Sequence, residues 1–403
     1  MIYSFYPFVT GHTLTMGNCN CNSERTHSSE TPVFADESFD FRIPALLYIK
    51  EWSKFLAFAE KRTSKKDEHA KNLVMRKGTR MADGSVEWSQ TENLMKATKE
   101  GYRTMNPCPV FDRNSRTLFL FFICLKGTTL ECMLKPGHTL LCYVTSTDCG
   151  DTWSDLTDLT NVIVTNFPNY RTFAVGPGHG IQLDNGTLLV PAYVKKVEGC
   201  RNCQGCWCCA GCCGCESTHS VVLRSEDQQT WQAGQPVALE SGECQLAEVL
   251  DREGRSQVYM NGRSTGEKRV EALSNDGGVN FTLQPELTLK ERPNGCQGSV
   301  LAFPARELPA VEAGSSESAL LFSHPTAGQG WDRLELGLYL SKSLQDQPPW
   351  DQSSIIHSGR SGYSDLTHCE EEGHFACLME CGEEERLKIV FRQFELHSLK
   401  STV

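Results

Sequence analysis

The feature that most constrains the fold of this chain is a hairpin pattern that occurs three times. Residues 146–153 read STDCGDTW and fit the pattern S-x-D-x-G-x-T-W, and residues 274–281 read SNDGGVNF and fit it with Phe in place of Trp. Residues 225–231, SEDQQTW, form a copy that is one residue shorter and lacks the glycine. In such a turn Asp caps backbone amides, Gly adopts a positive φ, and the aromatic ring packs between strands. Because each copy follows an apolar strand, the pattern predicts repeated four-stranded units.

The remaining sequence consists mostly of short apolar segments that are rich in β-branched and aromatic residues and bounded by Gly, Asp, Asn or Pro. Examples are residues 41–49 (FRIPALLYI), 55–60 (FLAFAE), 117–125 (TLFLFFICL), 139–146 (TLLCYVTS), 187–194 (TLLVPAYV) and 334–341 (LELGLYLS). The best candidate for a helix is the single segment at 64–76. Many evenly spaced strands without long helices indicate a sandwich, a barrel or a propeller, and the repeated hairpin favours the propeller.

Charge and hydropathy exclude several classes of protein. The chain has 403 residues, with 39 Lys and Arg against 50 Asp and Glu, a net charge of −11. No basic surface dominates, which argues against a nucleic-acid partner. The first sixteen residues contain no Lys or Arg and are interrupted by Pro7, so we expect no secretory signal peptide. The longest apolar run, 118–125, is too short to span a membrane.

The twenty cysteines fall into two groups. Most are scattered through apolar strands, as Cys124 and Cys142 are, where a free thiol behaves as a small hydrophobe. Eight lie between Cys200 and Cys215, within a loop insertion that we place at about 198–217. Three interpretations stay open for this cluster: a metal site, because pairs with C-x₂-C spacing occur; S-acylation that attaches the loop to a membrane; or a tolerated low-complexity insertion.

An ordered set of motifs closely resembles the vertebrate sialidases of the cytosolic and plasma-membrane type. The motifs are FRIP (41–44), AFAEKRTSKKDEHA (57–70), RTMNPCP (103–109), TFAVGPGHG (172–180), GCQGSV (295–300) and GYSDL (362–366). The resemblance extends from about 40 to 395, and the segment 370–382 (EEEGHFACLMECG) is more similar to the plasma-membrane ganglioside sialidase than to its cytosolic relative.

The resemblance implies a six-bladed β-propeller in which the repeated hairpins are Asp-boxes, with roughly 67 residues per blade. We therefore expect a poorly ordered segment at 1–35 and one propeller domain at 36–397. The implied activity is that of an exo-α-sialidase that removes terminal sialic acids from gangliosides, oligosaccharides and glycoproteins, without a metal or organic cofactor.

A sialidase must hold the carboxylate that its substrate carries on the anomeric carbon. Guanidinium groups suit this task because their planar fork pairs bidentately with a carboxylate and stays charged. The family uses three arginines, and the matching positions are Arg42, Arg263 and Arg333. Glu380 matches a family acid that orients Arg42.

The nucleophile is constrained by the same carboxylate, which would repel an attacking Asp or Glu, so sialidases use tyrosine. Tyr363 matches the family nucleophile. A neutral tyrosine needs a neighbouring base, and Glu243 matches that base. Glu248 is a rival base, but strand alternation places 243 and 248 on opposite faces, so only one of them reaches Tyr363. We favour Glu243.

Asp67 matches the family acid/base, which protonates the leaving oxygen, although the charged segment around it is equally typical of an exposed loop. The resemblance also assigns residues to the lining of the pocket: Arg62, Glu60, Met105, Asn106, Tyr193 and Gln297. Two positions depart from the family pattern. Lys195 replaces a second pocket tyrosine, and Gly242 replaces an aliphatic residue before Glu243, which we expect to enlarge the pocket.

Two alternatives to hydrolysis remain. A propeller that binds sialic acid without turnover would lack Tyr363, Glu243 or Asp67, and all three are present. A trans-sialidase would share every catalytic residue and differ in its acceptor site. The sequence predicts either a cytoplasmic protein or a peripheral membrane protein. In the second case, acylated cysteines would attach the protein to the plasma membrane or to an endomembrane.

Overall fold

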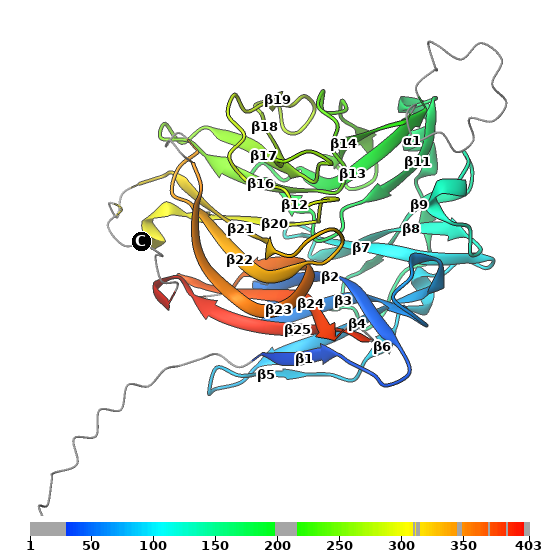
Figure 1. The fold of residues 1–403 in the computed structure, drawn as a ribbon, viewed down its shortest axis with the longest axis horizontal. Coiled ribbons are helices and arrows are strands. Elements are labelled where there is room, and N and C mark those ends of the chain that lie inside the picture. The colour runs from blue at the N-terminus through cyan, green and yellow to red at the C-terminus, as the bar shows by residue number, and fades with distance from the viewer. Residues whose placement is uncertain are drawn as a thin grey trace, which may run out of the picture.

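A computed structural model describes residues 30–197, 216–308, 311, 315–344, 349–369, 371–383 and 386–398. Within these ranges the fold is all-β, with antiparallel strands grouped into five sheets. The only α-helix in the described ranges is α1 (Thr160–Asn166), and the rest of the helical structure is single 3₁₀ turns, of which η2 (Asp67–His69) and η4 (Glu131–Met133) lie at the site. Figure 1 shows the sheets following one another around the molecule in chain order.

Four of the sheets contain consecutive strands. The first has β2 (Asp40–Ile49), β3 (Lys54–Arg62), β4 (Ala70–Arg80) and β5 (Val86–Trp88), with β6 (Glu92–Asn93) beside β4. The second has β7 (Tyr102–Asp112), β8 (Thr117–Lys126), β9 (Thr139–Ser146) and β10 (Thr157–Asp158). The third has β11 (Tyr170–Val175), β13 (Leu188–Val197), β14 (Glu216–Ser225) and β15 (Gln232–Ala233), with β12 (Ile181–Gln182) beside β13. The fourth has β16 (Cys244–Leu250), β17 (Ser256–Gly262), β18 (Val270–Ser274) and β19 (Thr282–Leu283).

The fifth sheet has seven strands and closes the ring. Its order is β1 (Thr31–Phe34), β25 (Arg386–Glu395), β24 (His374–Glu383), β23 (Asp351–His368), β22 (Leu334–Ser341), β21 (Ser318–Ala327) and β20 (Ser299–Pro304). The long strand β23 pairs with β22 along its first half and with β24 along its second half. Figure 1 shows the first strand of the fold, β1, beside the last, β25, so the two ends of the described chain are joined in one sheet.

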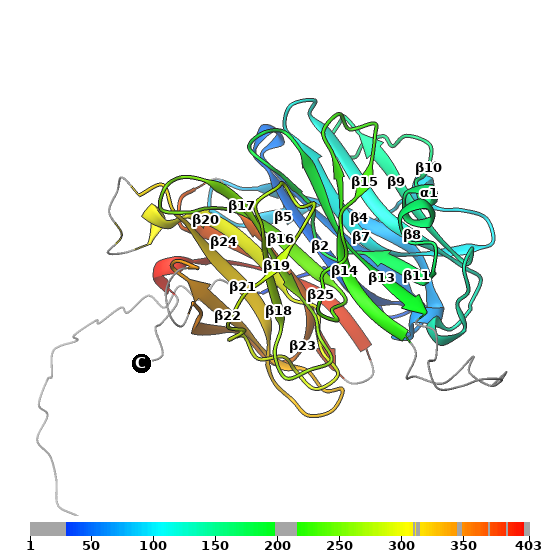
Figure 2. The same cartoon turned by 90° about the horizontal axis from the view of Figure 1, so that it is seen from above.

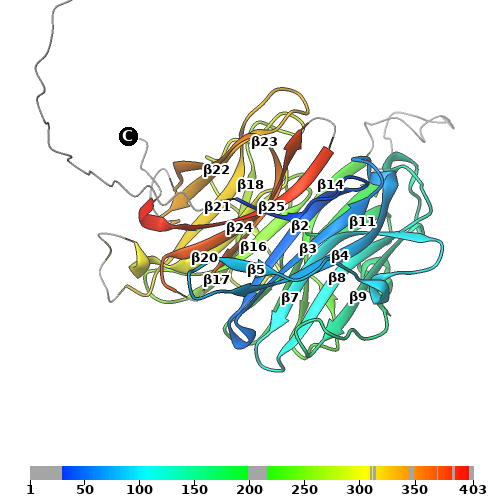
Figure 3. The same cartoon turned by 90° about the horizontal axis from the view of Figure 1, so that it is seen from below.

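The hydrophobic core is divided into clusters that lie between neighbouring sheets. Six large clusters of described residues follow one another around the ring. Three of them lie between the first and second sheets, between the second and third, and between the third and fourth. The other three lie between the fourth sheet and β20–β22, between β20–β22 and β24–β25, and between β24–β25 and the first sheet. Figures 2 and 3 show the corresponding neighbours from above and below, with β16–β19 beside β20–β22 and β24–β25 beside β2–β4. This arrangement is a propeller, in which each sheet buries both faces against its neighbours.

The three repeated turns hold their Asp side chains against backbone amides. Asp148 accepts hydrogen bonds from Thr152, whose backbone nitrogen lies 2.9 Å from Oδ1, and these bonds lower the pKa of Asp148 to about 2. Trp153 at the end of this turn packs edge-on against Phe58 of the neighbouring sheet, with ring centroids 6.4 Å apart. The aromatic residue of the turn therefore contributes to the packing between sheets.

Each strand expected from the sequence is present, but the expected helix at 64–76 is wrong. Residues 67–69 form η2, and the following residues form β4. Leu73, Val74 and Met75 are consecutive and fully buried because β4 is covered on both faces. A run that is buried on both faces shows neither strand alternation nor helical spacing.

The domain boundary at residue 36 also needs correction, because β1 begins at Thr31 and pairs with β25. Its four residues include the buried Val33 and Phe34, and Phe34 stacks on Phe41 at 5.6 Å. A four-residue strand that contains a proline carries too little pattern to be recognised without its partner. The cysteines from Cys200 to Cys215 lie outside the described residues, between β13 and β14, and the nine cysteines whose side chains the structure describes are free thiols.

Candidate active site

A cavity of about 650 Å³ opens where strands from several sheets meet near the middle of the ring. The strand β2 contacts β7 and β23, and β20 contacts β16 and β23, which brings distant parts of the chain together. The predicted site residues that line the cavity are Arg42, Arg62, Asp67, Met105, Asn106, Tyr193, Glu243, Arg263, Arg333, Tyr363 and Glu380.

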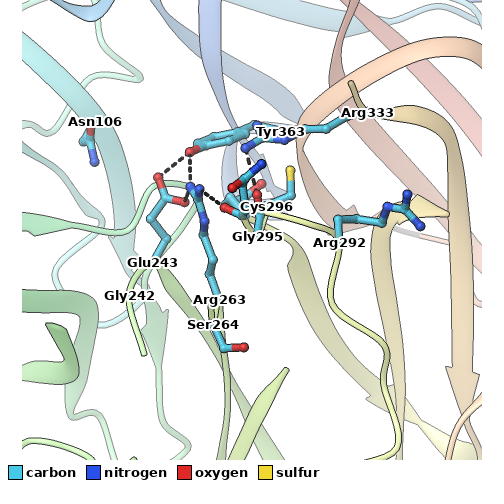
Figure 4. A network of polar contacts seen from close by, with 12 residues as sticks. Asn106, Gly242, Glu243, Arg263, Ser264, Arg292, Gly295, Cys296, Arg333 and Tyr363 are labelled. Carbon is cyan, nitrogen blue, oxygen red and sulfur yellow. Dashed lines mark hydrogen bonds and ion pairs between the residues drawn. The ribbon is translucent and has the colours of Figure 1, made fainter. Parts of the chain in front are cut away.

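Tyr363 lies at the centre of a short hydrogen-bonded group (Figure 4). Its hydroxyl donates to Glu243 Oε1 at 2.6 Å and accepts from Arg263 Nη1 at 3.0 Å. Arg263 Nη1 also lies 2.8 Å from Glu243 Oε2. Glu243 immediately precedes β16, Arg263 follows β17, and Tyr363 is in the second half of β23. These three residues therefore meet only because the ring brings two different sheets together.

The environment of Tyr363 keeps its hydroxyl protonated. Burial, followed by the negative charge of Glu243, raises the pKa of the phenol well above its usual value, although Arg263 and Arg333 act in the opposite direction. The side chain is almost fully buried, and its ring packs against Ile43 and Cys296. A neutral phenol with a carboxylate 2.6 Å away is arranged to lose its proton to that carboxylate when it attacks.

The three arginines surround this tyrosine. The guanidinium carbons of Arg42 and Arg333 lie 5.4 Å and 5.3 Å from the centre of the Tyr363 ring, and Arg263 contacts the hydroxyl. Burial is the largest single effect and would lower the pKa of Arg42 and of Arg263, but the neighbouring acidic groups together outweigh it and raise both pKa values, so both side chains stay charged. Three cations that converge on one cavity of an acidic protein form a site for an anion.

Glu380 in β24 holds Arg42 in place. Its Oε1 accepts from Arg42 Nε at 3.2 Å and from the backbone nitrogen of Ile43 at 2.8 Å, and its Oε2 accepts from the backbone nitrogen of Tyr363 at 3.2 Å. The carboxylate passes so close to Gly362 that a Cβ there would lie 2.3 Å from Oε2. A side chain at position 362 would therefore displace the carboxylate of Glu380 that holds Arg42.

Asp67 lies at the mouth of the cavity and is half-exposed. Its Oδ1 lies 2.6 Å from Arg62 Nη1 and 3.5 Å from Arg42 Nη1. Burial alone would raise the pKa of Asp67, but the guanidinium groups of Arg62 and Arg42 outweigh it and hold the pKa below its usual value. Arg62 is itself fully buried and is held by Glu60, whose Oε2 lies 2.9 Å from Arg62 Nε.

Two residues expected to line the pocket lie behind it. Glu60 is fully buried, where it accepts from Arg62 and from the backbone nitrogen of Asn106 at 2.7 Å. Gln297 is also buried and exchanges two hydrogen bonds with the backbone of Ser364, at 3.0 Å and 3.1 Å. Both lie beside the cavity, but their polar atoms are occupied by other groups of the protein. The local sequence cannot show this, because Asn106 and Ser364 are far from Glu60 and Gln297 in the sequence.

Glu248, the rival base, faces away from Tyr363. Its carboxylate accepts from the backbone nitrogen of Asp184 at 2.8 Å and from the hydroxyl of Ser256. The expected alternation along β16 therefore separates the two acids, and Glu243 is the one that contacts Tyr363.

The two departures from the family pattern both line the cavity. Lys195 lies 2.8 Å from Glu131 of η4, so it forms an ion pair across the cavity wall. A Cβ on Gly242 would meet only Thr218, at 3.8 Å. Gly242 therefore leaves space beside Glu243 that a larger residue could fill.

Several lining residues were not expected from the sequence. Trp331 is 73% exposed at the cavity mouth, two residues before Arg333. Asn294 also lines the cavity, and its backbone oxygen accepts from Arg263, while the backbone oxygen of the following residue, Gly295, accepts from Arg333. The Asn-Gly dipeptide is a turn signal that the sequence does carry, but its contact with arginines from two other segments depends on the fold. Among the described residues, no group of three or more His, Cys, Asp or Glu is placed to hold a metal ion.

Comparisons with known proteins identify the family of this chain. Residues 53–377 match the family model of the BNR repeat-like domain. Sialidase-3 of Bos taurus is 40% identical over 415 residues, which is 93% of this chain and 95% of that protein, and sialidase-2 of Cricetulus griseus is 39% identical over 90% and 94%. The chain belongs to the vertebrate sialidase family.

A solved sialidase shares the fold at much lower identity. The structure titled Trypanosoma rangeli sialidase in complex with 2,3-difluorosialic acid, a covalent intermediate, superimposes with a TM-score of 0.68 at 18% identity, over 90% of this chain and 58% of that one. As a sialidase, the present protein is a glycoside hydrolase that acts on sialylated glycoconjugates. No described helix has the length and hydrophobicity needed to cross a membrane.

Proposed function

We propose that this sialidase is an exo-α-sialidase that hydrolyses terminal sialic acids with retention of configuration, with Tyr363 as the nucleophile. The observation that supports this most strongly is the 2.6 Å hydrogen bond between Tyr363 and Glu243 at the centre of three arginines. The arginines bind the substrate carboxylate and so place the adjacent anomeric carbon over the tyrosine oxygen.

In the first step Tyr363 Oη bonds to the anomeric carbon while its proton passes to Glu243. The bond from that carbon to the aglycone oxygen breaks, and Asp67 donates its proton to this oxygen. In the second step Asp67, now ionised, takes a proton from water. The water oxygen bonds to the anomeric carbon, and Tyr363 leaves and recovers its proton from Glu243.

Asp67 must be protonated for the first step, although Arg62 and Arg42 hold its pKa low in the empty site. The substrate carboxylate changes this balance because it brings a negative charge to Arg42, 3.5 Å from Asp67. The aglycone also displaces water from the half-exposed carboxyl group. Both changes raise the pKa of Asp67, so substrate binding promotes protonation of the acid.

We infer six blades for the propeller. The change of partner along β23 supports a division of the seven-stranded sheet into β20–β22 with the first half of β23, and the second half of β23 with β24, β25 and β1. The three Ser–Asp turns are then the Asp-boxes of the second, third and fourth blades.

We propose gangliosides among the substrates, together with sialylated oligosaccharides and glycoproteins. Exposed apolar side chains at the cavity mouth, Leu130 and Trp331, support an aglycone that is presented from a lipid surface. Peripheral membrane attachment through acylated cysteines rests on the sequence alone, because Cys200 to Cys215 lie outside the described residues. Acyl exchange on the purified protein tests it.

The reaction is tested by proton NMR of an α-sialoside during hydrolysis. The α-anomer of free sialic acid should appear first and then mutarotate; β-sialic acid as the first product would refute the tyrosine mechanism. Parallel assays with ganglioside micelles and a soluble sialyl-oligosaccharide, across pH, test the carrier. Added lactose tests transfer, since a trans-sialidase would convert it to sialyl-lactose.

A further inference from the structure

The loop from Glu291 to Cys296 lies directly under the arginines and is not part of the reaction described above. Two successive backbone oxygens of this loop accept hydrogen bonds from two of them. Asn294 O accepts from Arg263 Nη2 at 2.7 Å, and Gly295 O accepts from Arg333 Nη2 at 2.9 Å. Figure 4 shows both arginines converging on this loop below Tyr363.

The loop is fastened by the carboxylate of Glu291. Oε1 accepts from the backbone nitrogens of Arg292 at 2.7 Å and Cys296 at 3.2 Å, which ties the start of the loop to its end. Oε2 accepts from the backbone nitrogen of Ser264 at 3.2 Å, next to Arg263. One side chain thus fixes both the loop and the residue that follows Arg263.

Glu291 is in turn fixed by a buried cation. Arg269 Nη1 lies 2.8 Å from Glu291 Oε2 and 2.7 Å from the backbone oxygen of Cys296, and both side chains are fully buried. Burial alone would raise the pKa of Glu291, but Arg269 and His324 lower it to about 2, so it remains ionised. None of these side chains lines the cavity.

We propose that Glu291 is a positioning residue for substrate recognition: through the loop 291–296 it sets the guanidinium groups of Arg263 and Arg333 in the geometry that binds the substrate carboxylate. This inference rests on the proposed function of the arginines and extends it. Guanidinium groups bind a carboxylate well only when their forks are correctly oriented, and a rigid support avoids the entropy cost of ordering them.

The close approach of the loop offers a variant that keeps the buried ion pair. A Cβ on Gly295 would lie 2.7 Å from Arg263 Nε and 2.5 Å from the backbone oxygen of Ser264. Gly295→Ala must therefore shift Arg263 or the loop. Gly84→Ala is the matched control, because Gly84 also has a positive φ, of 82°, but has no atom within 4 Å of its Cβ position. It carries the same backbone strain away from the site.

The readout is discrimination between an acid and its ester. The inhibition constants of 2-deoxy-2,3-didehydro-N-acetylneuraminic acid and its methyl ester are measured for each variant, together with KM and kcat for an aryl α-sialoside. For Gly295→Ala we expect KM to rise about 10-fold and the preference for the acid over the ester to fall by a similar factor. Gly84→Ala should match the wild type in each quantity.

A second variant tests Glu291 itself. Glu291→Gln alone would leave Arg269 as an uncompensated buried cation, so the double variant Arg269→Gln/Glu291→Gln is used. It should also lose preference for the acid over the ester, at a temperature where circular dichroism shows it folded. An unchanged acid-to-ester ratio in Gly295→Ala, or in the folded double variant, would overturn the inference. A wild-type enzyme without preference for the acid would instead overturn the proposed role of the arginines.

Discussion

The substitution Tyr363→Phe tests the centre of the proposed mechanism. It removes one oxygen, which donates to Glu243 at 2.6 Å and accepts from Arg263 at 3.0 Å, and leaves the buried ring in place. Without the oxygen no covalent intermediate can form. We expect kcat to fall about 10⁴-fold or more, which corresponds to at least about 5 kcal/mol of activation free energy.

The effect of Tyr363→Phe on stability should be small. A hydrogen bond to a charged group contributes about 1.5–3 kcal/mol, but Glu243 keeps its ion pair with Arg263 at 2.8 Å. We therefore expect the free energy of unfolding to fall by about 1–2 kcal/mol. Urea denaturation measures this change, and steady-state hydrolysis of an aryl α-sialoside measures the loss of turnover.

Tyr259→Phe is the matched control. The hydroxyl of Tyr259 donates to Glu271 at 2.7 Å and accepts from Asn261 at 3.0 Å, so the same kind of group is lost, but outside the cavity. This variant should lose a similar free energy of unfolding and keep kcat within about twofold of the wild type, because a substitution outside the cavity acts mainly on folding. Turnover of Tyr363→Phe within about tenfold of the wild type would refute the assignment of the nucleophile.

Three further predictions concern protons. Asp67→Asn should lower kcat by about 10²–10⁴-fold for a sialyl-lactoside and far less for a nitrophenyl sialoside, whose leaving group needs no acid; equal losses on both substrates would argue against Asp67 as the acid. Arg62 and Arg42 hold the pKa of Asp67 low in the free enzyme, and we expect bound substrate to raise it. The alkaline limb of kcat, which reports the enzyme with substrate bound, should therefore lie at higher pH than the alkaline limb of kcat/KM, which reports the free enzyme. Limbs that coincide would contradict the proposed effect of substrate on Asp67. The free energy of unfolding should fall in acid in two stages. In the first stage, below about pH 6.5, the unfolded chain takes up a proton on His324, which the folded protein resists because the folded pKa of His324 is about 4. In the second stage, below about pH 4.5, the same holds for Glu291, whose folded pKa is about 2. Each stage should lower the free energy of unfolding by on the order of 3 kcal/mol. The variant His324→Gln should lack only the first stage. If its denaturation midpoints between pH 7 and pH 3 do not differ from those of the wild type, this prediction is refuted.

The fold class and most residues of the candidate site could be predicted from the sequence. The strands could be predicted because their apolar runs end at turn residues, and the repeated turn indicated stacked four-stranded units. Arg42, Tyr363 and Glu243 could be named because family motifs surround them. These are local signals, since each depends on residues that are close together in the sequence.

How these residues are arranged relative to one another depends on the tertiary structure. It placed Gln297 behind the cavity, turned Glu248 away from Tyr363, and put β1 beside β25. It also revealed that Glu291, four residues before the motif GCQGSV, fastens the loop that holds two of the arginines. These contacts join segments that are far apart in the sequence, so no local pattern contains both partners. The local sequence fixes which face a side chain occupies, whereas closure of the ring determines what that side chain meets.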